Sequence, residues 1–377
     1  MAARSRTLTF GLPRMHKEEG ERRDFLPPLV GKLTDRGAQV FVERGIGSGM
    51  GLRDDDYLEL SPLVSAASNE EAFRTDVVLM LRCPDESEFL KLRPGAVLFA
   101  MLHFRTRPRR VSRLRELGLE AISMDSITDD AERRLVVDSW DVAWNGVEAA
   151  FDALERTWPE LTDPSRHPVR VTVMGAGEIG KHAVEAATKY GSLERNERFL
   201  RLGLPGVEVV TLGRNLTGDV AYMRHRLRGT DVLLDVTQRD DASRPIVPNA
   251  WIADLPPHAV ICDLVVDPYL LDEEPPTVRG VEGIPQGSLD QWIFAPDDPA
   301  WNLVPAEVPT GERRTVVSCY SWPGVHPVRC MELYGSQLAP LLEALLHAGG
   351  MDGLHAEGPY HARALHRASL RAWLGPD

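Results

Sequence analysis

Short apolar runs recur along most of the chain, and stretches with helical spacing lie between them. Runs of about four to eight apolar residues bounded by Gly, Pro or polar residues are typical of buried strands. They predict strands at 7–12, 39–43, 76–81, 96–102, 171–174, 207–212, 231–236, 259–266 and 315–320. Apolar residues at helical spacing predict helices at 29–36, 138–158, 181–189, 331–347 and 361–374. Strands that alternate with helices favour an α/β fold with mostly parallel sheets.

The predicted helix at 138–158 divides the chain. Its apolar stripe consists of Val142, Val147, Ala150, Phe151 and Leu154. A Pro-flanked segment, 159–168, joins it to the next predicted strand. A chain of 377 residues is long enough for about two domains, each with its own core. We therefore interpret this helix as the connection between two domains.

Composition is that of an ordinary globular protein, with 43% hydrophobic and 26% charged residues. No apolar run approaches the length of a membrane span, and the N-terminus lacks an apolar signal region. The cysteines have neither metal-site spacing nor a disulfide framework; they are Cys83, Cys262, Cys319 and Cys330. We expect reduced thiols, no bound metal, no membrane partner and a cytoplasmic protein.

The net charge of −13 disfavours a nucleic-acid surface. Residues 105–113 are locally basic, and we interpret them as a solvated turn and helix start. These features leave small molecules as the expected partners.

A glycine motif follows the predicted strand at 171–174. Gly175, Gly177 and Gly180 fit G-x-G-x-x-G, and a helical pattern comes next. In that setting the first glycine permits a tight turn, the second lets the backbone approach a pyrophosphate, and the third lets helix and strand pack closely. The anion would bind the N-terminus of the helix. The alternative is a tight turn with small-residue packing and no ligand.

Two cationic or titratable residues stand at the ends of predicted strands in the first part of the chain. Arg82 follows the strand at 76–81, and His103 follows the strand at 96–102. Ligands of parallel α/β sheets bind at the carboxyl ends of strands. An imidazole titrates near neutral pH, so His103 is the candidate for proton transfer. A strand-end histidine satisfied by backbone groups and a surface arginine are the alternatives.

Five segments, in this order and spacing, resemble the motifs of one superfamily, which includes alanine dehydrogenase, the matching subunit of nicotinamide nucleotide transhydrogenase, saccharopine dehydrogenase and N5-(carboxyethyl)ornithine synthase. The segments are Gly20–Pro28, Glu43–Asp56, Leu98–His103, Val260–Asp267 and Trp322–Pro327. The resemblance implies two Rossmann-like domains, the first of them discontinuous. We expect residues 1–140 to begin the substrate domain, 141–314 to form the nucleotide domain, and 315–377 to return to the first.

The resemblance also implies roles. Arg23 takes the place of the arginine that holds the substrate carboxylate, His103 that of the catalytic histidine, and Asp267 that of an aspartate beside nicotinamide and substrate. Trp322 begins the loop over the cofactor. The alternatives are an ion pair of Arg23 with Glu18, Glu19 or Glu21, and a turn carboxylate at Asp267. The predicted cofactor-binding residues are Gly175, Gly177, Glu178, Ile179, Gly180, Gly213, Arg214, Thr237, Asp267 and Trp322.

Three departures from the superfamily pattern bear on substrate and cofactor. Arg82 stands where the family has a substrate lysine, and an arginine pairs carboxylates but cannot act as a base. Gly213 and Arg214 follow the strand at 207–212, where NAD enzymes usually carry an acid, which favours NADP over NAD. The segment between Tyr190 and Val207 is longer than usual.

The sequence therefore predicts an NAD(P)-dependent oxidoreductase that transfers hydride between nicotinamide and the imine of a 2-oxo acid. Arg82, His103 and Asp267 are its predicted catalytic residues, and Arg23 and Arg82 its substrate-binding residues. With an arginine for each of two carboxylates, the pattern favours an amino acid as the amine and a secondary-amine product. Ammonia, as in alanine dehydrogenase, is the alternative, and a non-catalytic nucleotide-binding protein is another. We expect a homo-oligomer.

Overall fold

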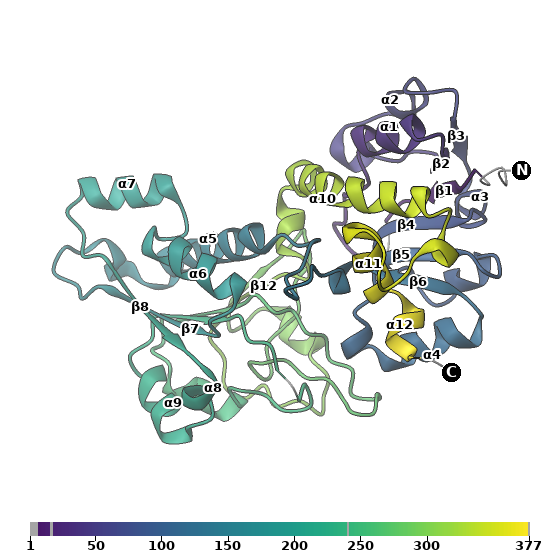
Figure 1. Ribbon diagram of the computed structural model, residues 1–377. Helices are drawn as coiled ribbons and strands as arrows, with labels where there is room; N and C mark the ends of the chain where they lie inside the picture. Colours follow the sequence, from purple (N-terminus) through teal and green to yellow (C-terminus); the bar gives the residue numbers. More distant parts are fainter. Residues whose placement is uncertain (1–6, 16–17, 240, 376–377) are drawn as a thin grey trace, which may run out of the picture. The chain divides into compact units, whose positions relative to one another are not determined.

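Two largely parallel sheets organise the chain (Figure 1). The computed structural model describes residues 7–15, 18–239 and 241–375. The chain divides into two compact units: unit 1 is Met1–Asp138 with His326–Asp377, and unit 2 is Ser139–Val325. The expected α/β class with two Rossmann-like sheets is confirmed.

Unit 1 contains a six-stranded parallel sheet in the order β3-β2-β1-β4-β5-β6. Its strands are β1 (Thr9–Leu12), β2 (Gln39–Glu43), β3 (Val64–Ala67), β4 (Val77–Arg82), β5 (Val97–Met101) and β6 (Glu120–Ser123). Its helices are α1 (Pro27–Asp35), α2 (Asp54–Leu58), α3 (Asn69–Phe73), α4 (Pro108–Glu116), α10 (Pro327–His347), α11 (Tyr360–Arg367) and α12 (Leu370–Leu374). The strand order reverses between β1 and β4, and such a switch point is where open α/β sheets bind ligands.

The core of unit 1 is built from apolar residues on both faces of this sheet. Phe10, Val40 and Phe99 are fully buried. At Gly11 a Cβ would lie 1.7 Å from the carbonyl oxygen of Ala72, so only glycine lets α3 pack this close to β1. Helix α10 packs against α1 and α11 and adds Leu338, among other residues, to the same core.

Unit 2 contains a six-stranded sheet in the order β11-β12-β10-β9-β7-β8, in which only β11 runs antiparallel to its neighbour. Its strands are β7 (Val169–Met174), β8 (Val207–Leu212), β9 (Val232–Asp235), β10 (Val260–Asp263), β11 (Ile293–Phe294) and β12 (Thr315–Ser318). Its helices are α5 (Ser139–Thr157), α6 (Glu178–Thr188), α7 (Leu193–Arg201), α8 (Arg214–Thr217) and α9 (Val220–Leu227). Apolar clusters on α5 and α6 cover one face, and a cluster that includes α9 covers the other.

Several short 3-10 helices complete both units. In unit 1 they are η1 (Ser48–Met50), η2 (Glu88–Lys91), η3 (Phe104–Thr106), η4 (Met124–Ser126) and η9 (Met351–Gly353). In unit 2 they are η5 (Pro159–Thr162), η6 (Asn249–Asp254), η7 (Pro299–Leu303) and η8 (Trp322–Val325). Of the helices in the described ranges, none is both long and apolar enough to cross a membrane.

One predicted element is corrected by the structure. The helix expected at 361–374 is broken into α11 and α12, because Ser369 takes an extended conformation and its side chain accepts the N–H of Ala372 as the N-cap of α12. The long segment after Tyr190 contains α7, which Arg195 ties to α5 through Asp152 and Glu155.

Candidate functional site

The glycine motif of unit 2 joins β7 to α6. Gly175 has a φ of +112°, and a Cβ there would lie 2.7 Å from the carbonyl oxygen of Val236. A Cβ on Gly180 would lie 2.6 Å from the carbonyl oxygen of Gly175. Beside Gly177, in contrast, there is open space, and no side chain caps the first turn of α6. The uncapped N–H groups and the open side of Gly177 fit a pyrophosphate.

The end of β8 lies next to the glycine motif in the sheet. Gly213 is the N-cap of α8, and Arg214 is its first residue. The Arg214 guanidinium donates to the carbonyl oxygen of Gln238 at 3.3 Å and is exposed. No acidic side chain follows β8 directly, so this position presents a cation where a ribose-binding acid would stand.

A row of polar residues crosses the carboxyl ends of three strands. Asp235, Asp263 and Ser318 are direct neighbours on β9, β10 and β12. Arg279 reaches this row from an irregular segment and donates to Asp263 at 2.6 Å and to Ser318 at 2.9 Å. Arg279 is 1% exposed, so this is a buried ion pair.

In the described part of the chain no arginine is bonded to Asp235, since Arg239, whose charge lowers the pKa of Asp235, pairs with Asp267 instead. Oδ1 of Asp235 accepts from the backbone N–H and the hydroxyl of Thr237 at 3.0 and 2.7 Å. Its Oδ2 is buried without a hydrogen-bond partner. Burial and then the negative charge of Asp263 raise the pKa of Asp235 to about 7. Asp235 therefore positions Thr237, a predicted cofactor-binding residue. Because its pKa is raised, the Asp235 carboxyl stays protonated to a higher pH than a free carboxyl does.

Two other predicted residues of unit 2 have partners within the unit. Asp267 accepts from Arg239 at 2.6 Å, and the Arg239 side chain is 5% exposed. Trp322 is 1% exposed and donates its indole N–H to the carbonyl oxygen of Asp263 at 2.9 Å. Asn145 of α5 donates to the backbone of Trp322, so the Trp322 side chain is part of the core of unit 2.

In unit 1, Arg23 forms a buried pair with Glu21. Nε and Nη2 of Arg23 donate to the two carboxylate oxygens at 2.8 and 2.6 Å, and Nη1 lies 3.7 Å from the sulfur of Cys330. The side chains are 2% and 0% exposed. Burial opposes ionisation of Glu21, but the bonds from Arg23 outweigh it and hold the pKa of Glu21 below its usual value. Arg23 therefore does not present an accessible guanidinium in this conformation.

Arg82, unlike Arg23, is partly exposed. It ends β4 and donates to Glu18 at 2.7 Å, and the two side chains are 29% and 21% exposed. A partly exposed ion pair is screened by solvent and contributes less to stability than a buried pair does.

His103 follows β5, the neighbour of β4, so Arg82 and His103 come to the same edge of the sheet. His103 has a φ of +52°, and its backbone N–H donates to Asp125 at 3.0 Å. Its ring Nδ1 lies 3.5 Å from the other oxygen of Asp125, and its side chain is 49% exposed. Burial raises the pKa of Asp125, but the bond and charge of His103 outweigh it and hold that pKa well below its usual range.

Asp125 was not among the residues predicted from sequence. It lies in η4, directly after β6, and the hydroxyl of Ser123 donates to it at 2.7 Å. Asp125 could have been predicted from its place after β6, the strand beside β5, but only if β6 had been recognised as a strand. Arg239 and Arg279 were missed as well, because both lie in irregular segments.

Part of the chain is similar to known proteins. Residues 11–140 match the domain family described as alanine dehydrogenase/PNT, N-terminal domain. Alanine dehydrogenase of Bacillus subtilis (strain 168) is 24% identical over 275 residues, which cover 69% of this chain and 71% of the relative. Alanine dehydrogenase of Mycobacterium tuberculosis (strain CDC 1551 / Oshkosh) is 26% identical over 271 residues, which cover 68% and 72%. Residues 11–140 therefore match this domain family, and over about two thirds of its length the chain is similar to alanine dehydrogenases.

Two solved structures have a similar fold. A structure of L-alanine dehydrogenase has a TM-score of 0.69 at 20% identity and covers 96% of this chain and 94% of its own. A transhydrogenase from Sinorhizobium meliloti has a TM-score of 0.60 at 19% identity, with coverage of 90% and 94%. The domain-family match at 11–140 contains Arg23, Arg82 and His103.

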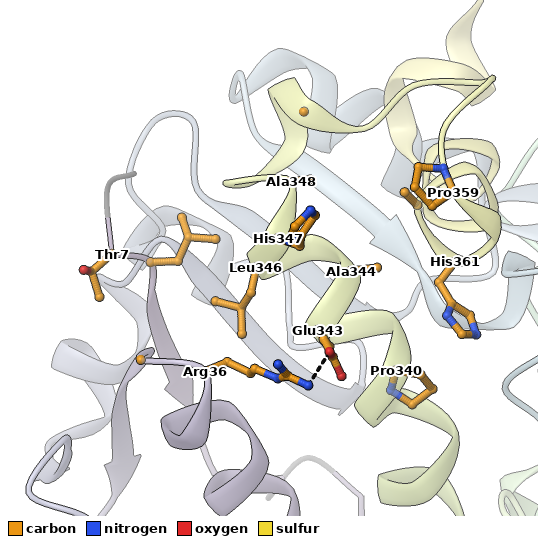
Figure 2. Close-up of a pocket in the computed structure, with 14 residues that line it drawn as sticks. Thr7, Arg36, Pro340, Glu343, Ala344, Leu346, His347, Ala348, Pro359 and His361 are labelled. Carbon is orange, nitrogen blue, oxygen red and sulfur yellow. Dashed lines mark ion pairs between the residues drawn. The ribbon is translucent and has the colours of Figure 1, made fainter. Parts of the chain in front are cut away.

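A cavity of about 650 Å³ in unit 1 contains none of the predicted site residues (Figure 2). It lies between the C-terminal end of α10 and the start of α11. Arg36 and Glu343 line the cavity and form an ion pair of 2.5 Å. His347 at the end of α10 and His361 at the start of α11 also line it. Within the described ranges, no cluster of three or more His, Cys, Asp or Glu side chains is arranged to hold a metal ion.

Proposed function

We propose that this chain is an NAD(P)-dependent oxidoreductase that acts on the CH–NH₂ or CH–NH group of an amino acid. The observation that carries the proposal is the pair of His103 and Asp125 beside Arg82, at the carboxyl edge of the unit 1 sheet. Relatives that align with more than two thirds of the chain are alanine dehydrogenases, which supports the same class.

The residues of unit 1 supply proton transfer and carboxylate binding. Asp125 faces Nδ1 of His103 and favours a proton there, so Nε2 is the atom that gives or takes a proton. In the reductive direction, Nε2 of the protonated ring would donate a proton to the hydroxyl of the adduct formed from the 2-oxo acid and the amine, and this hydroxyl would leave as water. The resulting iminium carbon would then accept the hydride. The Arg82 guanidinium forms an ion pair with the substrate carboxylate after its ion pair with Glu18 breaks.

The residues of unit 2 hold the nucleotide. The N-terminus of α6 and the open side of Gly177 would bind the pyrophosphate, and Thr237, fixed by Asp235, would border it. A bound nicotinamide supplies or accepts the hydride. The cation at Arg214 favours a 2′-phosphate, so we propose NADPH as the preferred cofactor.

We propose ammonia as the amine, with a 2-oxo acid such as pyruvate as its partner. The secondary-amine reaction is the second candidate. It was favoured by two arginines that each hold a carboxylate, but Arg23 is bonded to Glu21 in the interior of unit 1. Arg82 in place of a lysine remains the observation in its favour.

The test is the oxidation of NADPH and NADH with pyruvate or 2-oxoglutarate, each with ammonium or a panel of amino acids. Turnover with ammonium supports the alanine dehydrogenase type of reaction, and turnover only with an amino acid supports the secondary-amine reaction. Nucleotide binding without turnover in any combination would leave the non-catalytic alternative.

A further inference from the structure

The C-terminal segment of unit 1 is joined to the edge of its sheet. β6 is the last strand in the order, and Ser369 pairs with Ile122 of this strand in an isolated antiparallel bridge. The backbone N–H of Ser123 donates to the carbonyl oxygen of Ala368 at 2.9 Å. Residues 368–374, here named the C-terminal brace, therefore satisfy part of an edge that would otherwise be unpaired.

Ser123 connects the brace to the turn that carries His103. This serine is fully buried. Its hydroxyl donates to Asp125 at 2.7 Å and accepts the backbone N–H of Leu102 at 3.3 Å. Asp125 in turn holds both the backbone and the ring of His103. One serine thus links the brace directly to Leu102 and, through Asp125, to His103.

The brace also contacts this turn directly. The ring of Trp373 in α12 packs on Phe104, the residue after His103, with centroids 5.9 Å apart and planes at 46°. Phe104 is 2% exposed, whereas Trp373 is 47% exposed. Because an isolated five-residue helix is not stable in water, α12 depends on its anchors. Leu370, which is buried in the core of unit 1, and the N-cap Ser369 provide them. Arg371 adds ion pairs with Glu120 of β6 at 2.7 Å and with Asp352 at 2.9 Å.

The His103 turn requires such support. A φ of +52° places His103 in the left-handed region, which costs a non-glycine residue on the order of 1 kcal/mol or more and persists only where neighbours impose it. The neighbours here are Ser123 and Asp125, Arg110, which donates to the carbonyl oxygen of Leu102 at 2.7 Å, and Trp373.

We infer that the C-terminal brace positions His103 for proton transfer, and that Trp373 is its positioning residue. This inference rests on the proposed role of His103. If the brace loosens, the imidazole leaves its orientation against Asp125, and proton transfer slows while nucleotide binding in unit 2 is unaffected. Misplacement of a reacting group by about 1 Å can cost up to about 100-fold in rate.

The role of Trp373 is tested with three variants: Trp373→Ala, Trp373→Phe and, as the control, Tyr360→Ala. Tyr360 is an aromatic residue of the adjacent α11 with 39% exposure, and its ring packs on His361 and Arg363. Turnover is measured with NADPH or NADH, pyruvate and ammonium, and nucleotide affinity by fluorescence. The ring ¹⁵N signals of His103, assigned with His103→Gln, report the contact with Asp125 independently of turnover.

Trp373→Ala should lower kcat about 10-fold or more, change the pH profile of kcat/KM and shift the His103 ring signals, with unchanged nucleotide affinity. Trp373→Phe should restore most of both readouts, and Tyr360→Ala should change neither. A folded Trp373→Ala variant with wild-type ring signals would overturn the inference. If Trp373→Ala loses the contact between the His103 ring and Asp125 while His103→Ala still turns over, the brace does position His103, but the catalytic role of His103 is refuted.

Discussion

Glu21 holds Arg23 through two parallel hydrogen bonds, and neither side chain reaches the surface. Arg82 and Glu18 form a second pair of the same charges in the same unit, but that pair is partly exposed. The contrast separates a buried arginine from one that solvent can reach.

The two pairs should differ in their contribution to stability. Glu21→Gln leaves a buried guanidinium without its counter-ion and should lower the free energy of unfolding by roughly 3 kcal/mol or more. Glu18→Gln, the matched control, should cost less than about 1 kcal/mol. Urea unfolding of both variants measures the difference, and equal costs would contradict this assignment. Because the pKa of Glu21 is depressed in the folded chain, its contribution is present above the unfolded pKa and is lost as the pH falls through the folded pKa.

Asp125 should control proton transfer by His103. We expect Asp125→Asn to lower turnover roughly 10-fold or more, because the amide no longer favours the imidazole orientation and protonation that the carboxylate does. His103→Ala should lose about 100-fold or more. Asp130→Asn, which removes an exposed partner of Arg363, is the control. Nucleotide affinity should be the same in all three; wild-type turnover of Asp125→Asn would remove Asp125 from the mechanism.

Asp235 should make the protein less stable as the pH rises. Its folded pKa of about 7 lies above the unfolded value, so its contribution is fully present below the unfolded pKa and is lost as the pH rises toward 7. Asp235→Asn, which cannot ionise, should be more stable than wild type by roughly 1 to 4 kcal/mol at pH 8 and nearly equal to it at pH 4. Glu208→Gln, an exposed residue of β8, is the control. Urea unfolding at both pH values tests this, and a pH-independent difference would show that Asp235 remains ionised.

The glycines of the motif should separate into a ligand position and packing positions. Gly177→Ala meets no atom of the chain, so it should fold normally and bind nucleotide at least about 10-fold more weakly. Gly180→Ala places a Cβ 2.6 Å from a backbone oxygen and should destabilise unit 2 itself. Thermal unfolding and nucleotide titration separate the two effects. If Gly177→Ala binds nucleotide as well as wild type does, the pyrophosphate does not approach there.

Arg214 should set the choice of cofactor. We expect Arg214→Ala to raise KM for NADPH about 10-fold or more and to leave KM for NADH nearly unchanged, because only NADPH carries the 2′-phosphate. Arg228→Ala, which removes an exposed arginine of the same unit paired with Asp254, is the control. A preference of the wild type for NADH that persists in Arg214→Ala would contradict the proposal.

How much of the fold could be predicted depended on how apolar each element is. Strands 39–43 and 207–212 agree with β2 and β8 to the residue. β3 and β6 were not recognised, because Val-Ser-Ala-Ala and Glu-Ala-Ile-Ser are short and carry a weak apolar signal. The division of the last helix also escaped notice, since it depends on one serine that pairs with β6 as well as capping α12.

The candidate site was predictable where sequence spacing alone places residues. The glycine motif and the strand ends at Arg82 and His103 are local features, and the parallel sheet brings the latter two to one edge. The partners of these residues are not local. Asp125 reaches His103 through a strand that was missed, and Arg279 reaches Asp263 from an irregular segment. Pattern can locate a charged side chain, but only the folded chain determines which opposite charge it meets.

The interrupted order of unit 1 has a consequence for its synthesis. Helix α10 supplies core residues such as Leu338 and the Cys330 thiol beside Arg23, yet it follows all of unit 2 in the chain. At the usual pace of translation, roughly 10 to 40 s pass between the emergence of Asp138 and that of His326. During that interval, the N-terminal strands carry an apolar face and an arginine–glutamate pair that nothing from α10 yet covers. The nascent protein is therefore most exposed to aggregation at its oldest residues, and chaperone binding there is expected to end when α10 leaves the ribosome.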